Sequence, residues 1–207
     1  MTVRNDLVLR KYQRIARFYD LVDLPFELLR YRPIRPLLFR DLHGRLLDAG
    51  VGTGRNLPFY PPGSEVFSVD LSSAMLQRAV RRKNDAGATV HLVEMDLARL
   101  AFADNFFDAA VASFVFCTMP TGARIAALRE LARVVRTDGR VRLLEYAPAQ
   151  TAIRKVVARI WQPWVRWAFG ANLQQDIEPE LAEASLTLIT SRYVSSSIKL
   201  IEAAPTK

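Results

Sequence analysis

The chain has few side chains of the kinds that crosslink proteins or bind transition metals. Its 207 residues include one cysteine, Cys117, and two histidines, His43 and His91. A single cysteine excludes a disulfide within the chain, and these three side chains do not provide a zinc constellation. We expect Cys117, which has apolar neighbours, to be a buried thiol in a reducing compartment rather than a nucleophile.

Long apolar runs are also missing. No stretch of about 20 uninterrupted apolar residues is present, so the sequence predicts no membrane-spanning helix. Arginines are scattered through the N-terminal region, which lacks the apolar core of a signal peptide. There are no repeats, and a hydrophobic content of 50% argues against disorder. These features favour one domain over residues 1–207 and a cytoplasmic location.

Acidic residues are outnumbered, with 21 against 29 basic residues and a formal net charge of +8. A GC-rich genome, which favours arginine, would explain much of this excess. Residues 1–40 nevertheless hold nine basic and four acidic side chains, a balance that suits phosphate groups on lipid or nucleic acid. We interpret residues 1–40 as a basic helical cap, interrupted by Pro25, Pro33 and Pro36.

Glycines number only nine, yet three of them are spaced two apart directly after an apolar segment, in Leu46-Leu47-Asp48-Ala49-Gly50-Val51-Gly52-Thr53-Gly54. A second apolar segment then ends in a carboxylate at Asp70. In α/β proteins such a loop lets the backbone approach a nucleoside, and the acid can hold a ribose diol. A dinucleotide site would require glycine where Arg55 stands, so the spacing favours another nucleoside ligand.

Strand-like and helical segments alternate along the rest of the chain. Thr137-Asp138-Gly139 predicts a turn. The alternation favours a mostly parallel sheet with helices on both faces. We expect strands at about 45–49, 65–69, 89–94, 107–116 and 140–145, helices at about 72–82 and 121–135, and a C-terminal hairpin at 186–194 and 197–203.

The loop from Asp48 to Gly54, the acid at Asp70 and the order of the segments resemble class I S-adenosylmethionine-dependent methyltransferases over about residues 10–205. This resemblance implies a Rossmann-like α/β fold of seven strands with a C-terminal antiparallel hairpin. It also implies S-adenosylmethionine as the cofactor, with Asp70 on the ribose and Asp96 on the adenine. The cofactor-binding residues that it implies are Tyr12, Asp48, Gly50, Gly52, Gly54, Asp70, Leu71, Met75, Asp96, Leu97 and Ser113.

Several of these residues have a structural alternative. Asp70 could cap the following helix, Met75 could belong to the core, and Asp96 could only shape a turn. For catalysis, Tyr19 and Tyr146 are candidates because an aromatic ring can stabilise a cationic centre, although each could be an ordinary half-buried tyrosine.

Glu145 could serve as a base, but we expect this carboxylate at a strand end to pair with an arginine.

Shorter motifs bear on the acceptor. Three of them resemble bacterial phospholipid N-methyltransferases and ubiquinone/menaquinone methyltransferases, whereas the loop 56–63 and Glu145 resemble membrane-associated thiol methyltransferases. Tyr146, however, stands where that last group has histidine. The three motifs are Tyr12-x6-Tyr19-Asp20-Leu21, Leu71-Ser72-x2-Met75-Leu76 and Arg133-Val134-Val135-Arg136-x2-Gly139.

These resemblances imply a lipid or lipid-like acceptor, and first a phospholipid amine, phosphatidylethanolamine. A quinone, thiol or other hydrophobic molecule is the alternative, and a non-catalytic cofactor-binding protein is a third hypothesis. The segment 113–116 lacks the Asn/Asp-Pro-Pro-aromatic motif of nucleic-acid methyltransferases, which argues against nucleic acid.

The segment Ile153–Phe169 combines four basic residues and three tryptophans with no acid. Tryptophans three apart share one helix stripe, and cations beside aromatics suit an anionic membrane surface, here the inner face of the membrane. Alternatively, this part of the 146–180 insertion forms a wall of the acceptor pocket. Pro163 is expected to interrupt any simple helix there.

Overall fold

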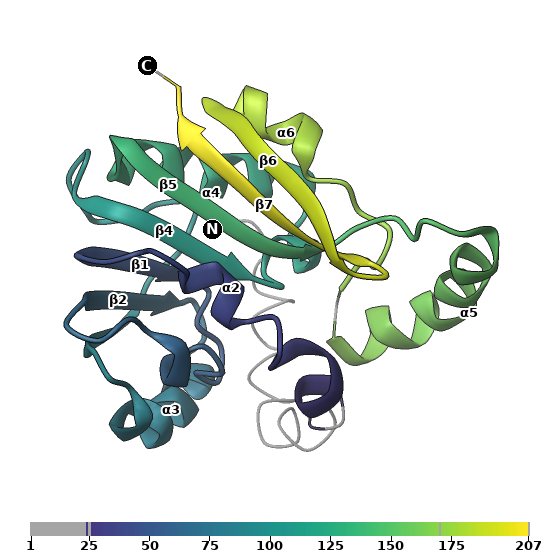
Figure 1. The fold of residues 1–207 in the computed structure, drawn as a ribbon, viewed down its shortest axis with the longest axis horizontal. Helices are drawn as coiled ribbons and strands as arrows, with labels where there is room; N and C mark the ends of the chain where they lie inside the picture. Colours follow the sequence, from purple (N-terminus) through teal and green to yellow (C-terminus); the bar gives the residue numbers. More distant parts are fainter. Residues whose placement is uncertain (1–23, 25, 170, 207) are drawn as a thin grey trace.

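One seven-stranded sheet organises the chain (Figure 1). The structure, a computed structural model, describes residues 24, 26–169 and 171–206. In the order β3-β2-β1-β4-β5-β7-β6, the first five strands pair in parallel, and β7 runs antiparallel to both β5 and β6. The strands are β1 (Arg45–Ala49), β2 (Glu65–Asp70), β3 (Thr89–Glu94), β4 (Phe107–Ser113), β5 (Val135–Tyr146), β6 (Leu186–Ser195) and β7 (Ile198–Pro205). This confirms the predicted mostly parallel sheet and its C-terminal hairpin.

Helices cover both faces of the sheet, as the sequence predicts. Successive residues of a strand point to opposite faces, so Leu46 and Leu47 of β1 enter two different cores. The helical segments are η1 (Glu27–Tyr31), α2 (Pro36–Phe39), η2 (Leu57–Phe59), α3 (Ser73–Arg82), η3 (Lys83–Asp85), η4 (Phe116–Thr118), α4 (Thr121–Val134), α5 (Ala152–Phe169) and α6 (Glu178–Glu183).

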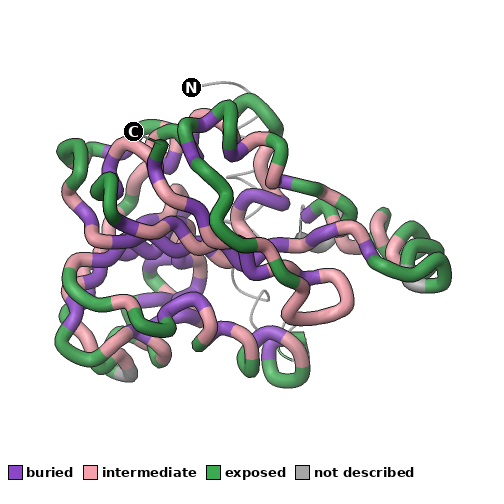
Figure 2. Tube along the Cα trace, turned by 45° about the horizontal axis from the view of Figure 1, so that its top comes forward, coloured by how far each residue is buried: buried purple, intermediate pink, exposed green. Residues whose placement is uncertain are grey.

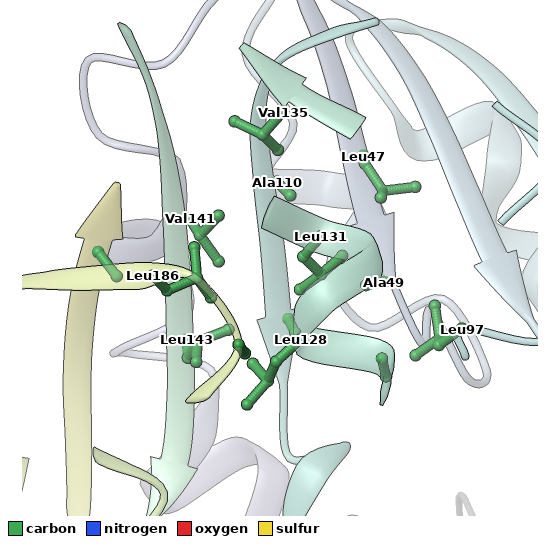
Figure 3. Packing of buried hydrophobic residues seen from close by; sticks show 14 of the residues in the cluster. Leu47, Ala49, Leu97, Ala110, Leu128, Leu131, Val135, Val141, Leu143 and Leu186 are labelled. Carbon is green, nitrogen blue, oxygen red and sulfur yellow. The ribbon is translucent and has the colours of Figure 1, made fainter. Parts of the chain in front are cut away.

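The core on one face is built by α4 and α6. Leu128 and Leu131 of α4 pack with Leu47 and with Leu143 of β5 (Figure 3). On the other face, α2, η2 and α3 supply Leu38, Leu57 and Leu76, among other residues, to a second core. Figure 2 shows the buried residues gathered along the strands between these layers. Burial on both sides explains why β4 is a nearly continuous apolar run.

Most element boundaries agree with the sequence, and Ser72 caps α3 by accepting a hydrogen bond from the amide of Met75. The prediction of a turn at Thr137–Gly139 is wrong, because these residues lie within β5. Phe107 pairs with Val135 and Ala109 with Arg140, so the extra residues form a bulge in the ladder.

The expected end of the fourth strand is also corrected. β4 stops at Ser113 instead of residue 116, because Phe114 has a φ of 57° and turns the chain toward η4.

The expectation that Pro163 interrupts its helix is wrong too. α5 runs unbroken from Ala152 to Phe169 with Pro163 inside it. A proline there removes one amide donor, but the neighbouring Gln162 ties the helix to the following segment. Its side chain donates to the carbonyl of Ala171 at 3.0 Å and accepts from the amide of Leu173 at 2.8 Å.

α5 and α6 form the connection from β5 to β6, and α5 extends away from the sheet (Figure 1). Within the ranges that the structure describes, no helix combines the length and the apolar character needed to cross a membrane. Tyr12 and Tyr19 lie outside the described residues, as does most of the basic cap predicted at 1–40.

Candidate functional site

A cavity of about 530 Å³ opens where the carboxyl ends of β1, β2, β4 and β5 meet. This is the usual ligand position in an open α/β sheet, and the volume is in the usual range for ligand sites. Residues implied by the family resemblance line one part of it: Gly50, Gly52, Asp70, Leu71, Met75, Asp96, Leu97 and Ser113. The rest of the wall comes from η1, the segment after β4, Tyr146 and α5.

The glycine loop forms the floor of this cavity. The amides of Gly50 and Val51 donate to the carbonyl of Val69 at 2.8 and 2.9 Å, which anchors the loop to β2. A Cβ on Gly50, whose φ is 79°, would come within 2.3 Å of the Val115 side chain. A Cβ on Gly52 would meet nothing within 4 Å, so the backbone there stands against open space. The loop therefore leaves room for a ligand to approach its backbone closely.

Asp70 shapes the loop and faces the same space. Its carboxylate accepts hydrogen bonds from the amides of Gly52 and Ser72, both at 2.8 Å. Burial raises its pKa, although these two amides oppose the shift. Because each oxygen accepts only one of these bonds, the carboxylate keeps acceptor capacity for hydroxyl groups of a ribose. The helix cap is Ser72 instead, so capping does not account for Asp70.

The structural alternatives hold in part for two neighbours. Met75 is buried in addition to lining the cavity, and Asp96 accepts from the amide of Ala98 at 2.9 Å, which shapes a turn. Neither observation removes these residues from the cavity wall.

Asp48 and Gly54 do not line the cavity. Asp48 is fully buried and accepts hydrogen bonds from the hydroxyl of Tyr60 at 2.5 Å and from the side-chain NH2 of Asn56 at 3.1 Å. Burial raises the pKa of Asp48 to about 6. A Cβ on Gly54 would collide with Leu57. Both residues support the loop from behind and stand outside the cavity wall, so their expected contact with the cofactor stays a prediction.

The sequence reasoning missed a buried ion pair beside the site. Arg35, which is 5% exposed, donates to both carboxylate oxygens of Glu27 at 2.9 and 2.8 Å. It also donates to the side chain of Asn56 at 2.7 Å and to the Ser113 hydroxyl at 3.1 Å. This network fixes the segment before β1 to the glycine loop and to the end of β4. The sequence offered no signal for it, since Arg35 is one of many arginines.

An aromatic cluster of Tyr31, Phe114 and Tyr146 lines the cavity beyond Ser113. Ring centroids lie 4.8 Å apart for Tyr31–Phe114 and 5.2 Å apart for Phe114–Tyr146, and the two tyrosine hydroxyls are 2.5 Å apart. Burial raises the pKa of Tyr146 well above its usual value, so its hydroxyl keeps its proton. The left-handed backbone of Phe114 is uncommon outside glycine and is typical of functional sites. Of these three residues, the sequence singled out Tyr146.

Among the residues that the structure describes, the partners of Glu145 are backbone amides and not an arginine, contrary to expectation. Its buried carboxylate accepts hydrogen bonds from the backbone amides of Val115 and Phe116, both at 2.8 Å, and of Cys117 at 3.2 Å. Burial raises its pKa to about 7, and the amides oppose that shift. Glu145 therefore holds the segment that carries Phe114 in place. Burial also raises the pKa of Cys117 well above its usual value, so this residue is a protonated thiol.

Comparison with known proteins places this arrangement in a family. Residues 47–143 match the model of a methyltransferase domain. The phosphatidylethanolamine N-methyltransferase of Cereibacter sphaeroides is 33% identical over 74% of this chain and 77% of its own. The demethylmenaquinone methyltransferase of Thermus thermophilus is 32% identical over 72% of this chain and 70% of its own.

Solved structures agree in fold. A Haloferax volcanii protein in complex with the methyltransferase activator Trm112 has a TM-score of 0.71 at 14% identity and covers 95% of this chain and 98% of its own. Geranyl diphosphate C-methyltransferase of Streptomyces coelicolor, solved with S-adenosyl-L-homocysteine, has a TM-score of 0.66 at 16% identity and covers 84% and 80%. The chain belongs to the family of S-adenosylmethionine-dependent methyltransferases.

Proposed function

We propose that this methyltransferase acts on a lipid-like amphiphile, and first on a phospholipid amine, phosphatidylethanolamine. The observation that carries the proposal is the shape of the cavity wall. From the glycine loop the wall continues past the aromatic cluster to apolar side chains of the segment at η1 and of α5. Phe26, Trp161 and Trp164 belong to this wall and are also exposed at the surface. Such a wall suits a ligand with a polar reactive end and an apolar tail.

S-adenosylmethionine supplies an electrophilic methyl group on a sulfonium, so an amine nitrogen can displace it in one step. The residues of the chain bind and orient the reactants. Backbone at Gly50 and Gly52 and the carboxylate of Asp70 face the nucleoside side, and Leu71, Asp96, Leu97 and Ser113 complete that end of the wall. Holding both reactants in line accounts for much of the rate gain in such a transfer.

The aromatic cluster is the proposed site of the acceptor nitrogen. Ring faces attract cationic centres, so Tyr31, Phe114 and Tyr146 would stabilise the positive charge that develops on nitrogen during transfer. The amine attacks in its neutral form, so the attack needs no base. The methylated ammonium that results then releases one proton to water. Tyr12 and Tyr19, implied by the family resemblance, stay predictions for the same site.

The acceptor would be taken from an anionic membrane surface. α5 exposes Ile153, Val156 and Ile160, and Leu29 of η1 is 85% exposed. The sequence of α5 contains four basic residues and no acid. Apolar residues with cations suit the interface of an anionic bilayer. Since side chains of α5 also form the cavity wall, a lipid would pass directly from this surface to the aromatic cluster.

The test is incubation of the protein with radiolabelled S-adenosylmethionine and a total lipid extract, followed by separation of the lipid classes. We expect label in mono- and dimethylated phosphatidylethanolamine. Label in the quinone fraction or in a thiol would assign the alternative acceptor, and label in no fraction would contradict a lipid-like acceptor altogether.

A further inference from the structure

Two arginines of the cavity wall differ in how their charge is compensated. Arg35 is buried against the carboxylate of Glu27. Arg30, in the last turn of η1, is partly exposed and donates a hydrogen bond to the hydroxyl of Ser197 in the β6–β7 turn. Among the residues that the structure describes, no carboxylate pairs with Arg30. Within that part of the chain its guanidinium makes only the bond to Ser197, and its other N–H groups can donate to a ligand in the cavity.

Contacts place Arg30 beside the aromatic cluster, which itself adjoins the glycine loop. The side chain of Val115 covers Gly50, and the adjacent Phe114 packs against Tyr146. Arg30 donates to the hydroxyl of Ser197, and the carbonyl of Ser197 accepts from the amide of Ala147 at 3.0 Å, the residue that follows Tyr146. Ser196 and Ser197 line the cavity beside it. The aromatic cluster therefore adjoins both the glycine loop and the group formed by Arg30 and the two serines, and all of these groups line one cavity.

We propose that Arg30 and Ser197 form a subsite for a phosphate ester in the head group of the acceptor. The inference rests on the proposed function, since the aromatic cluster would hold the amine of the same molecule. In an ethanolamine head group two carbons separate the nitrogen from the phosphate oxygen, so both ends are bound at neighbouring positions. A planar guanidinium matches phosphate oxygens in pairs, and a serine hydroxyl adds one donor. Quinones and thiols present no such anion.

The experiment measures kcat and KM with dihexanoyl-phosphatidylethanolamine kept monomeric, so that membrane binding plays no part. We expect Arg30→Gln to raise KM about 10- to 100-fold, the range for lost charge-assisted hydrogen bonds, with little change in kcat. Arg30→Lys should recover part of the loss, because it restores the charge without the planar fork. The matched control is Arg32→Gln, which removes an exposed charge two residues away and should leave KM unchanged.

Two further acceptors test whether Arg30 recognises the phosphate, and whether it does so in a soluble phosphate ester as well as in a lipid head group. Dodecylamine, which has no phosphate, should be methylated equally by wild type and Arg30→Gln. Soluble phosphoethanolamine should show the same Arg30 dependence of KM, because Arg30 binds the phosphate itself; equal KM values of wild type and Arg30→Gln with this acceptor would contradict the subsite. An unchanged KM in Arg30→Gln, with wild-type turnover of the phospholipid, overturns the subsite alone. If wild type methylates no phosphatidylethanolamine, the proposed function itself is overturned.

Discussion

The pH dependence of stability tests the placement of Glu145. Burial raises the pKa of this carboxyl from 4.5 to about 7, a difference worth about 3 kcal/mol. Because the folded protein holds the proton more tightly than the unfolded chain, this contribution is fully present below pH 4.5. It is lost as the pH rises to about 7. We therefore expect Glu145 to make the folded state less stable toward neutral pH.

Glu145→Gln isolates this contribution, since glutamine does not titrate. Its carbonyl can still accept from the amides of Val115 and Phe116, while its NH2 group faces the amide of Cys117. Urea unfolding of both proteins between pH 4.5 and 7.5 gives the difference in unfolding free energy. The advantage of wild type over Glu145→Gln should shrink by about 3 kcal/mol across this range. Asp48 titrates equally in both proteins and cancels.

A difference that stays constant within about 1 kcal/mol over that range would refute the reasoning. It would mean that water or a cation reaches the carboxylate and that burial does not raise its pKa. A matched control is Glu65→Gln at the partly exposed amino end of β2. The pKa of Glu65 is lowered from 4.5 by its hydrogen bond to Arg45, so its contribution is lost only below pH 4.5, and the advantage of wild type over this variant should stay nearly constant between pH 4.5 and 7.5.

Two other predictions concern binding. Asp70→Ala should weaken S-adenosylmethionine binding about 10- to 100-fold in titration calorimetry, because a carboxylate that accepts hydroxyl hydrogen bonds is lost. Glu65→Ala, at the other end of β2, should leave the affinity unchanged. Equal affinities of Asp70→Ala and wild type would contradict the ribose contact. In liposome flotation, Ile160→Glu should reduce the amount of protein recovered with anionic vesicles. The control Val80→Glu changes a side chain of α3 that is 56% exposed, and it should leave that amount unchanged. Equal recovery of these two variants would exclude α5 as the docking surface.

The cofactor side of the site was predictable because its signals are local. An apolar strand, glycines two apart and an acid after the next strand lie within residues 46–70, and the backbone geometry of each part follows from its own residues. The strands β1 and β3 begin and end where the sequence predicts. The β5 bulge was not predictable, since Gly139 packs against the Asp108 carbonyl of another strand and does not make a turn.

The sequence by itself determined the fold class, the position of the glycine loop and the identity of the methyl donor. Only the tertiary structure decided which buried polar groups meet. Glu145 bonds amides about 30 residues earlier in the chain, and Tyr31 meets Tyr146 across 115 positions. Partners of buried charges and hydroxyls depend on which segments the sheet brings together, and no local pattern records that. For this reason the sequence named only Tyr146 of the aromatic cluster, and its partners Tyr31 and Phe114, with Arg30 beside them, emerged from the structure.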